Sequence, residues 1–361
     1  MSYIFSISTF NLLRITSFSK DAKMKAIIFY EYGDLSQLKY VDVSSPKIQQ
    51  GEALIRVKAS ALNHLDIWER MGGVPLPHIS GSDIAGEVAE LEKDTTGFDV
   101  GDKVVVFPVI SCGQCDFCLI GETTQCRYRQ LIGFQIDGGY AEYVKVPTSN
   151  LFLIPSNLSF EEASTIPVAG STAWRMLISK SQLNKNSKVL IHGSSSSVSL
   201  FAVQIAKIFG AKVILTTNSS NKAKKALKLG ADNVINYLEE NVINEVKRIT
   251  RGEGVDIVID HVGTATFDTS LKSLKRGGKM VSAGVTTGKE VTLDLQYLYR
   301  NELTLAGSYL FTMDEFRYVL KMVEEKKLKT IISDVFSLKD AAKAQSLMEQ
   351  SMHFGKIILK I

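Results

Sequence analysis

The sequence predicts an α/β protein in which a region of short strands precedes a parallel β-sheet covered by helices on both faces. Two observations carry this prediction. From Lys25 to about Val146, short apolar runs are separated by Gly and Asp, as in strands joined by turns. From about Pro155 onward, short apolar strands alternate with helical patterns, which is typical of a parallel sheet buried on both faces.

The first region is expected to be almost entirely β-structure. Its apolar runs have the length of strands and lack a helical period. We expect strands at residues 25–30, 52–60, 86–91, 102–107 and 141–146.

The second region alternates between the two kinds of element. Its expected strands are residues 189–192, 212–217, 233–237, 256–262, 279–284 and 303–308. Val198, Phe201, Ala202, Ile205 and Ile208 recur with the period of a helix buried on one face. Further helices are expected at 221–229, 241–250 and 267–274. Two helical patterns, 314–325 and 338–349, precede a final strand at 356–361, and the pattern alone assigns this segment to neither region.

Length and composition indicate a globular protein of about two domains. The chain has 361 residues, of which 45% are hydrophobic and 22% charged. The net charge of +4 is spread along the chain, so no basic face for nucleic acid is expected. No apolar run is long enough to cross a membrane. We expect residues 1–23 to be a disordered extension, or to precede a true start at Met24.

Four cysteines lie close together in the sequence, and the chain has no others. Cys112, Cys115, Cys118 and Cys126 supply four thiolate donors within a short loop. Four thiolates fill the tetrahedral coordination of zinc and leave no open position, so the predicted site is a structural zinc. Two disulfides, free thiols or an iron–sulfur cluster are the alternatives. Clustered thiols also favour a reducing compartment, and we expect the cytoplasm.

A small-residue turn follows the strand at 189–192. Gly193, Ser194, Ser195, Ser196 and Ser197 lead into the helix that begins near Val198. Free N–H groups and the positive end of a helix dipole at such a turn suit a pyrophosphate. Serines stand where glycines are usual in this motif, so a helix that is merely capped by serine is the alternative.

The end of the next strand bears on the choice of dinucleotide. NAD sites usually place an acidic residue there to hold the ribose hydroxyls. Residues 212–228 contain no acid, whereas Ser219 and Lys222 offer a hydroxyl and a cation that suit a 2′-phosphate. We therefore expect NADP(H) in preference to NAD(H). The alternative is that the lysines form a solvated helix face.

Together these features resemble the medium-chain dehydrogenase/reductases, the superfamily of zinc-containing alcohol dehydrogenases. The resemblance runs from about Met24 to Ile361 and rests on GSDIAGEV, the cysteine loop, PVAGSTAW, DHVG and SLKSLKRGGKMVSAG. It implies a Rossmann doubly wound parallel sheet inserted in a GroES-like β-barrel domain. The implied divisions are a catalytic domain at 24–153 and 311–361 with a zinc lobe at 108–130, and a cofactor domain at 154–310.

The sequence departs from the family where zinc alcohol dehydrogenases hold a catalytic zinc. The three ligand positions read Asn63, Ser82 and Val168, and the proton-relay hydroxyl reads Leu65. Amide and hydroxyl oxygens bind zinc poorly, and valine does not bind it. His64, Asp66, His78 and Asp83 are all of metal-binding types, but their spacing does not favour a site. A hydrogen-bonded His64 and an exposed His78 are the expected alternative.

The resemblance is strongest to the quinone oxidoreductase-like branch with a structural zinc lobe. It implies hydride transfer to a quinone, an enone or an enoyl-type double bond without catalytic zinc. Asn63 is the expected hydrogen-bond donor, Asp66 its positioning partner or a proton relay, and His64 an alternative acid. Thr172 is expected beside the nicotinamide, with backbone groups near Val262, Ala283, Gly284 and Val285, while Lys222 and Tyr237 match the residues that hold the 2′-phosphate. Trp68, Trp174, Tyr297 and Phe311 are loosely placed near the substrate.

Two other functions stay open at this point. One is a zinc-type alcohol or aldehyde dehydrogenase with an atypical site. The other is a non-catalytic structural or RNA-binding protein that binds a cofactor. The apolar segment LTLAGSYL is expected to be an edge strand that pairs with a second copy, giving a homodimer or homotetramer.

Overall fold

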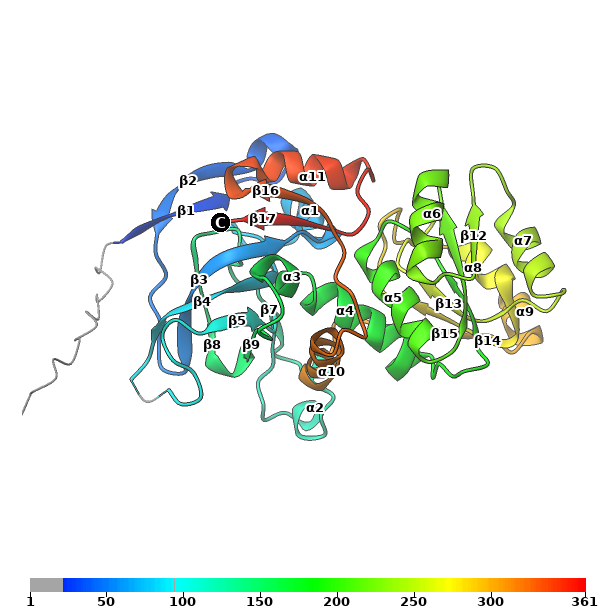
Figure 1. The fold of residues 1–361 in the computed structure, drawn as a ribbon, viewed down its shortest axis with the longest axis horizontal. Coiled ribbons are helices and arrows are strands. Elements are labelled where there is room, and N and C mark those ends of the chain that lie inside the picture. Colours follow the sequence, from blue (N-terminus) through cyan, green and yellow to red (C-terminus); the bar gives the residue numbers. More distant parts are fainter. Residues whose placement is uncertain (1–21, 94) are drawn as a thin grey trace, which may run out of the picture.

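The computed structural model describes residues 22–93 and 95–361, and its two main sheets lie side by side (Figure 1). The expectations for residues 1–21 lie outside the described residues. The first strand begins at Lys23 and pairs with Ser44, so it starts one residue before the predicted domain start at Met24. Within the described residues, no helix is long and apolar enough to cross a membrane.

The N-terminal half and the end of the chain build a seven-stranded sheet. Its order is β16-β17-β3-β4-β5-β9, with β8 paired to β3. The strands are β3 (Glu52–Ala61), β4 (Asp83–Leu91), β5 (Lys103–Val106), β8 (Tyr143–Pro147), β9 (Leu151–Leu153), β16 (Ile332–Ser337) and β17 (Lys356–Lys360). Two small sheets flank it, formed by β1 (Lys23–Ile28) with β2 (Lys39–Ser44) and by β6 (Val109–Ile110) with β7 (Gln130–Leu131). The C-terminal segment therefore returns to the first region, as the resemblance implies.

The middle of the chain builds a six-stranded, fully parallel sheet. The strand order is β12-β11-β10-β13-β14-β15. The chain adds β11 and β12 on one side of β10 and then β13, β14 and β15 on the other side, as in the Rossmann fold. The strands are β10 (Lys188–Ile191), β11 (Lys212–Thr217), β12 (Asn233–Asn236), β13 (Val255–Asp260), β14 (Leu274–Ser282) and β15 (Thr304–Gly307). The helices are α5 (Ser197–Ile208), α6 (Ser220–Leu229), α7 (Val242–Ile249), α8 (Phe267–Ser273) and α9 (Leu295–Arg300). The expected α/β fold is confirmed.

Further helices lie in and around the first region. They are α1 (His64–Met71), α2 (Asp116–Leu119), α3 (Phe160–Ser164), α4 (Pro167–Trp174), α10 (Met313–Glu324) and α11 (Ala341–Glu349), with a π-helix at Arg175–Lys180. The helix α4 packs against both α5 and α10, so it joins the two halves of the molecule (Figure 1). A continuous apolar core runs through this junction, with Phe311 and Phe316 both beside Phe107.

Candidate active site

A cavity of about 210 Å³ lies between the two sheets. It brings together residues from the start of α1, from α4, from the turn after β10, from the end of β14 and from the start of β17. The predicted site residues that line it are Asn63, His64, Thr172, Ser196, Ser197, Val198, Ala283 and Gly284. Trp68 and Phe311 also line it, whereas Trp174 stacks on Tyr318 and contacts Phe209 instead.

Two of the three positions that hold zinc in zinc alcohol dehydrogenases, Asn63 and Val168, line this cavity. The carboxylate of Asp83 joins them, because Asn63 Nδ2 donates to its Oδ2 at 3.0 Å and the backbone N–H of Val168 donates to its Oδ1 at 2.8 Å. Ser82, the neighbour of Asp83, is fully buried and its hydroxyl has no partner. Residues far apart in the sequence, Asn63, Asp83 and Val168, are thus joined in one hydrogen-bonded group.

A lysine that the sequence analysis did not identify completes this group. Lys356, on β17, is 1% exposed. Its ammonium donates to Leu62 O at 2.8 Å, to Asn63 Oδ1 at 2.7 Å and to Asp83 Oδ2 at 2.6 Å. A lysine at the start of an apolar strand was the only signal in the sequence, and nothing there indicates its partners.

These donors do not fit a catalytic zinc. Valine has no ligand atom, and the amide oxygen of Asn63 already accepts from Lys356. A catalytic zinc needs three protein ligands, and it favours imidazole, thiolate or carboxylate over amide and hydroxyl oxygens. Within the described residues, the cysteine cluster is the only group of three or more His, Cys, Asp or Glu side chains whose ligand atoms converge closely enough to hold one metal ion.

Asp66 is hydrogen-bonded to the backbone of Asn63. It is fully buried, and its Oδ2 accepts from the Asn63 backbone N–H at 2.8 Å and from the Tyr140 hydroxyl at 2.6 Å. Burial, with the nearby charge of Glu69, raises the pKa of Asp66 to about 8. Asp66 therefore holds the backbone of Asn63 in place, and its side chain keeps a proton near neutral pH.

Two histidines have surroundings that the sequence did not predict. The expectation of an exposed His78 is wrong, because His78 is 2% exposed and hydrogen-bonds to Gly133 O at 3.0 Å. His353, not identified from the sequence, lines the cavity with its Nδ1 unpartnered. Burial lowers the pKa of both His64 and His353 to about 4, so these imidazoles are neutral at pH 7.

The turn after β10 has the form expected of a phosphate loop. Gly193 adopts a φ of 75°, which favours glycine. Ser196 caps α5 without a side-chain hydrogen bond, which leaves first-turn N–H groups for an anion. Ser194 points elsewhere, since its hydroxyl donates to Thr217 Oγ1 at 2.7 Å, and Ser195 O accepts from Gly355 N at 3.0 Å.

The residues predicted for the 2′-phosphate are divided between two further cavities. Ser219 and Lys222 line one of about 740 Å³, and Lys222 Nζ donates to Ser351 O at 2.6 Å. Tyr237 lines another of about 430 Å³, together with Gly193 and Val262. The structure therefore does not place Lys222 and Tyr237 in one cavity, and Val285 lines none of these three.

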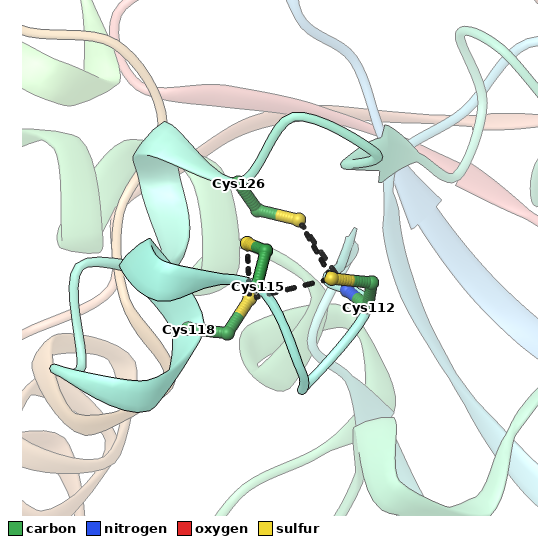
Figure 2. A group of neighbouring side chains, drawn as sticks. All are labelled: Cys112, Cys115, Cys118 and Cys126. Carbon is green, nitrogen blue, oxygen red and sulfur yellow. Dashed lines mark hydrogen bonds between the residues drawn. The ribbon is translucent and has the colours of Figure 1, made fainter.

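The four cysteines converge, as Figure 2 shows. All four sulfur atoms lie within 4.8 Å of one another, and Cys126 is buried. The sulfur atoms of Cys115 and Cys118 are 3.5 Å apart, and those of Cys112 and Cys126 also 3.5 Å apart, so neither pair is a disulfide here. Four convergent thiols fit a tetrahedral structural zinc.

The two sheets and the cavity between them indicate what kind of enzyme this is. A Rossmann sheet with a phosphate loop, set against a β-rich unit across a cavity, is the architecture of a nicotinamide-dependent dehydrogenase or reductase. Residues 49–156 match the alcohol dehydrogenase GroES-like domain, and residues 197–325 match the zinc-binding dehydrogenase family.

Known proteins align with this chain over nearly its whole length. An acryloyl-coenzyme A reductase of Sulfurisphaera tokodaii is 33% identical, over 93% of this chain and all of that protein. A NAD-dependent alcohol dehydrogenase of Sulfolobus acidocaldarius is 34% identical, over 94% of this chain and all of that protein. A crystal structure of a NAD-dependent alcohol dehydrogenase superimposes with a TM-score of 0.90 and 39% identity, covering 94% of this chain and all of that one. The chain belongs to the medium-chain dehydrogenase/reductase family and is an oxidoreductase.

Proposed function

We propose that the protein is an NADP(H)-dependent reductase of activated double bonds, such as those of enones, quinones or enoyl thioesters, and that it works without a catalytic zinc. Likeness to an acryloyl-coenzyme A reductase supports the reaction class. The single observation that carries the proposal is the hydrogen-bonded group of Asn63, Asp83 and Lys356 at the position of a catalytic metal.

The chemistry of the acceptor explains why an amide is sufficient at this position. Bound NADPH supplies a hydride. Addition to the β-carbon of an enone or enoyl thioester breaks the C=C π bond and leaves an enolate, which takes a proton from solvent at the α-carbon. Its negative charge develops on the carbonyl oxygen, where a hydrogen-bond donor is worth about 3–4 kcal/mol.

The residues around the cavity have complementary roles in this proposal. Asn63 donates to the carbonyl oxygen, and Asp66 holds the Asn63 backbone. Thr172 would lie beside the nicotinamide. His64, whose pKa is lowered to about 4 by burial, is neutral at pH 7, so it suits hydrogen-bond donation better than proton transfer. The apolar side chains of Leu65, Trp68, Leu131, Val168, Leu310 and Phe311 line the rest of the cavity and suit a hydrocarbon chain or ring.

The preference for NADP(H) rests on residues at the end of β11. No acid lies in residues 212–228, and Ser219 and Lys222 share a cavity. Lys222 would exchange its bond to Ser351 O for one to the 2′-phosphate, a stronger, charge-assisted partner. We further propose that Cys112, Cys115, Cys118 and Cys126 hold one structural zinc and that the protein acts in a reducing compartment such as the cytoplasm.

Alcohol or aldehyde dehydrogenation is the second candidate, because other relatives are named alcohol dehydrogenases. The two are separated by assaying one preparation with NADPH on enones, quinones, enoyl thioesters and aldehydes, and with NADP⁺ on alcohols. We expect turnover of the conjugated acceptors that persists in the presence of a chelator. Alcohol oxidation that the chelator abolishes, in a protein that stays folded, would favour the second candidate.

A further inference from the structure

The hydrogen bonds of Lys356 use its full capacity. An ammonium group has three N–H donors and no acceptor. Those of Lys356 go to Leu62 O, Asn63 Oδ1 and Asp83 Oδ2, at 2.6 to 2.8 Å. Lys356 therefore has no donor left for a substrate, although it lines the cavity, and any effect on the reaction must pass through its partners.

These partners determine which way the amide of Asn63 faces. A cation can bond only to the amide oxygen, and a carboxylate only to the amide nitrogen. Turning the amide over would set N–H groups against Lys356 and the oxygen against Asp83, two repulsive contacts in a buried site. One N–H of Nδ2 bonds to Asp83, which leaves the other for a ligand in the cavity.

We infer that Lys356 and Asp83 are positioning residues that fix the orientation of the Asn63 amide, so that Asn63 offers its second N–H as a hydrogen-bond donor to a substrate. This inference rests on the proposed function and narrows its substrate class. An acceptor oxygen that gains negative charge, such as that of an enolate, can accept a hydrogen bond from the second N–H of Asn63. A substrate hydroxyl that needs an acceptor is less well served by Asn63, because its Oδ1 already accepts from Lys356. Donation by Lys356 to Oδ1 also polarises the amide and strengthens its N–H as a donor.

The test compares variants at Lys356, at Asp83 and at a control position with the wild type and with Asn63→Ala. Lys356→Met alone leaves Asp83 as a buried unpaired charge and can unfold the protein, so the main variant is Asp83→Asn/Lys356→Met, which removes both charges together. Lys356→Arg keeps the charge. Lys360→Met removes a lysine from the same strand whose side chain is 66% exposed, and it serves as the matched control.

We expect the double variant and Asn63→Ala each to lower kcat, and the two effects not to add when the substitutions are combined. The double variant should lower kcat about 10²–10³-fold, as Asn63→Ala should, with an unchanged dissociation constant for NADPH. Combined with Asn63→Ala, it should cost less than about threefold more. Lys356→Arg should restore part of kcat, and Lys360→Met should equal the wild type. A wild-type kcat in the double variant, or losses that multiply, would overturn the inference.

A measurement that needs no substrate separates this inference from the proposed function. In protein labelled with ¹⁵N-asparagine, the Asn63 amide is identified by the resonances missing from Asn63→Asp. We expect its two protons to be well separated, one bonded to Asp83 and one free, and to converge in the double variant. Unchanged resonances would refute the positioning role. If the wild type reduces no conjugated acceptor, the proposed function fails while this measurement still decides the orientation of the amide.

Discussion

Asn63 occupies a position between a cation and an anion, with Lys356 on its oxygen and Asp83 on its nitrogen. Its backbone is held separately by Asp66. The side chain and main chain of this one residue are thus fixed by three charged or protonated neighbours, all of them less than 2% exposed. A preorganised donor of this kind loses little entropy when charge develops on a substrate oxygen.

Replacement of Asn63 by Ala should lower kcat for an enone by about 10²–10³-fold, because one donor to the developing charge is lost. The dissociation constant of NADPH, measured by nicotinamide fluorescence, should stay within about twofold. Asp268→Asn, which changes an exposed side chain on α8, is the control. Full turnover in Asn63→Ala would show that another group stabilises the charge.

Asp66 should give the folded protein a distinct pH dependence. Its pKa is about 8 in the fold and 3.8 for a free side chain, so the folded state holds the proton more tightly. The free energy of unfolding should therefore fall as pH rises from about 4 to 8, and Asp66→Asn should lack this contribution. Urea unfolding of both proteins across that range measures the difference. A difference in stability that is constant with pH would contradict the assignment.

Two turns are the elements that we propose to bind the cofactor. The turn from β10 into α5 leaves helix N–H groups free, and the turn from β11 into α6 presents Ser219 and Lys222. Lys222 reaches across to Ser351 O, in the segment that precedes β17. The same lysine therefore links the Rossmann sheet to the opposite half of the molecule.

Lys222→Ala should raise the dissociation constant of NADPH about tenfold or more, since a charge-assisted hydrogen bond to the 2′-phosphate is lost. NADH binding should change much less, because it has no phosphate there. Lys228→Ala, on the same helix but outside the cavity, is the control. An equal loss for both cofactors would indicate that Lys222 acts only on the contact between the two halves.

The sequence revealed the Rossmann half well and the rest less completely. Continuously apolar strands such as residues 256–262, and the one-sided helix at 198–208, depend on local periodicity, and both occur within a few residues of the predicted bounds. The strands β2 and β16 were not predicted, because they are half-exposed and depend on pairing with β1 and β17. Lys356 was missed because its partner Asn63 lies 293 residues away.

For the whole molecule, β15 is the feature that bears on assembly. It pairs only with β14 and lies at the edge of the parallel sheet. Leu305 on this strand is 37% exposed. An open, uncharged edge is a template for another strand, and we propose that β15 pairs with its counterpart in a second copy. The resulting unit is a homodimer, or two such units form a tetramer.

Leu305→Lys should shift the protein toward the monomer, because it places like charges opposite each other across the paired edge. Sedimentation velocity at micromolar concentration measures the change. Leu238→Lys adds the same charge at a 70% exposed position that follows β12, at the opposite edge of the sheet, and should sediment as the wild type does. A wild-type monomer, or an unaltered Leu305→Lys oligomer, would rule out this interface.

We propose that reduction takes place without a metal at the reacting centre. The decisive measurement counts zinc per chain in an active preparation and again after mild chelation, with enone reduction measured each time. We expect one zinc per chain, held by the four cysteines, and a rate that does not depend on any further metal. A second zinc whose removal abolishes turnover while the fold persists would contradict the account.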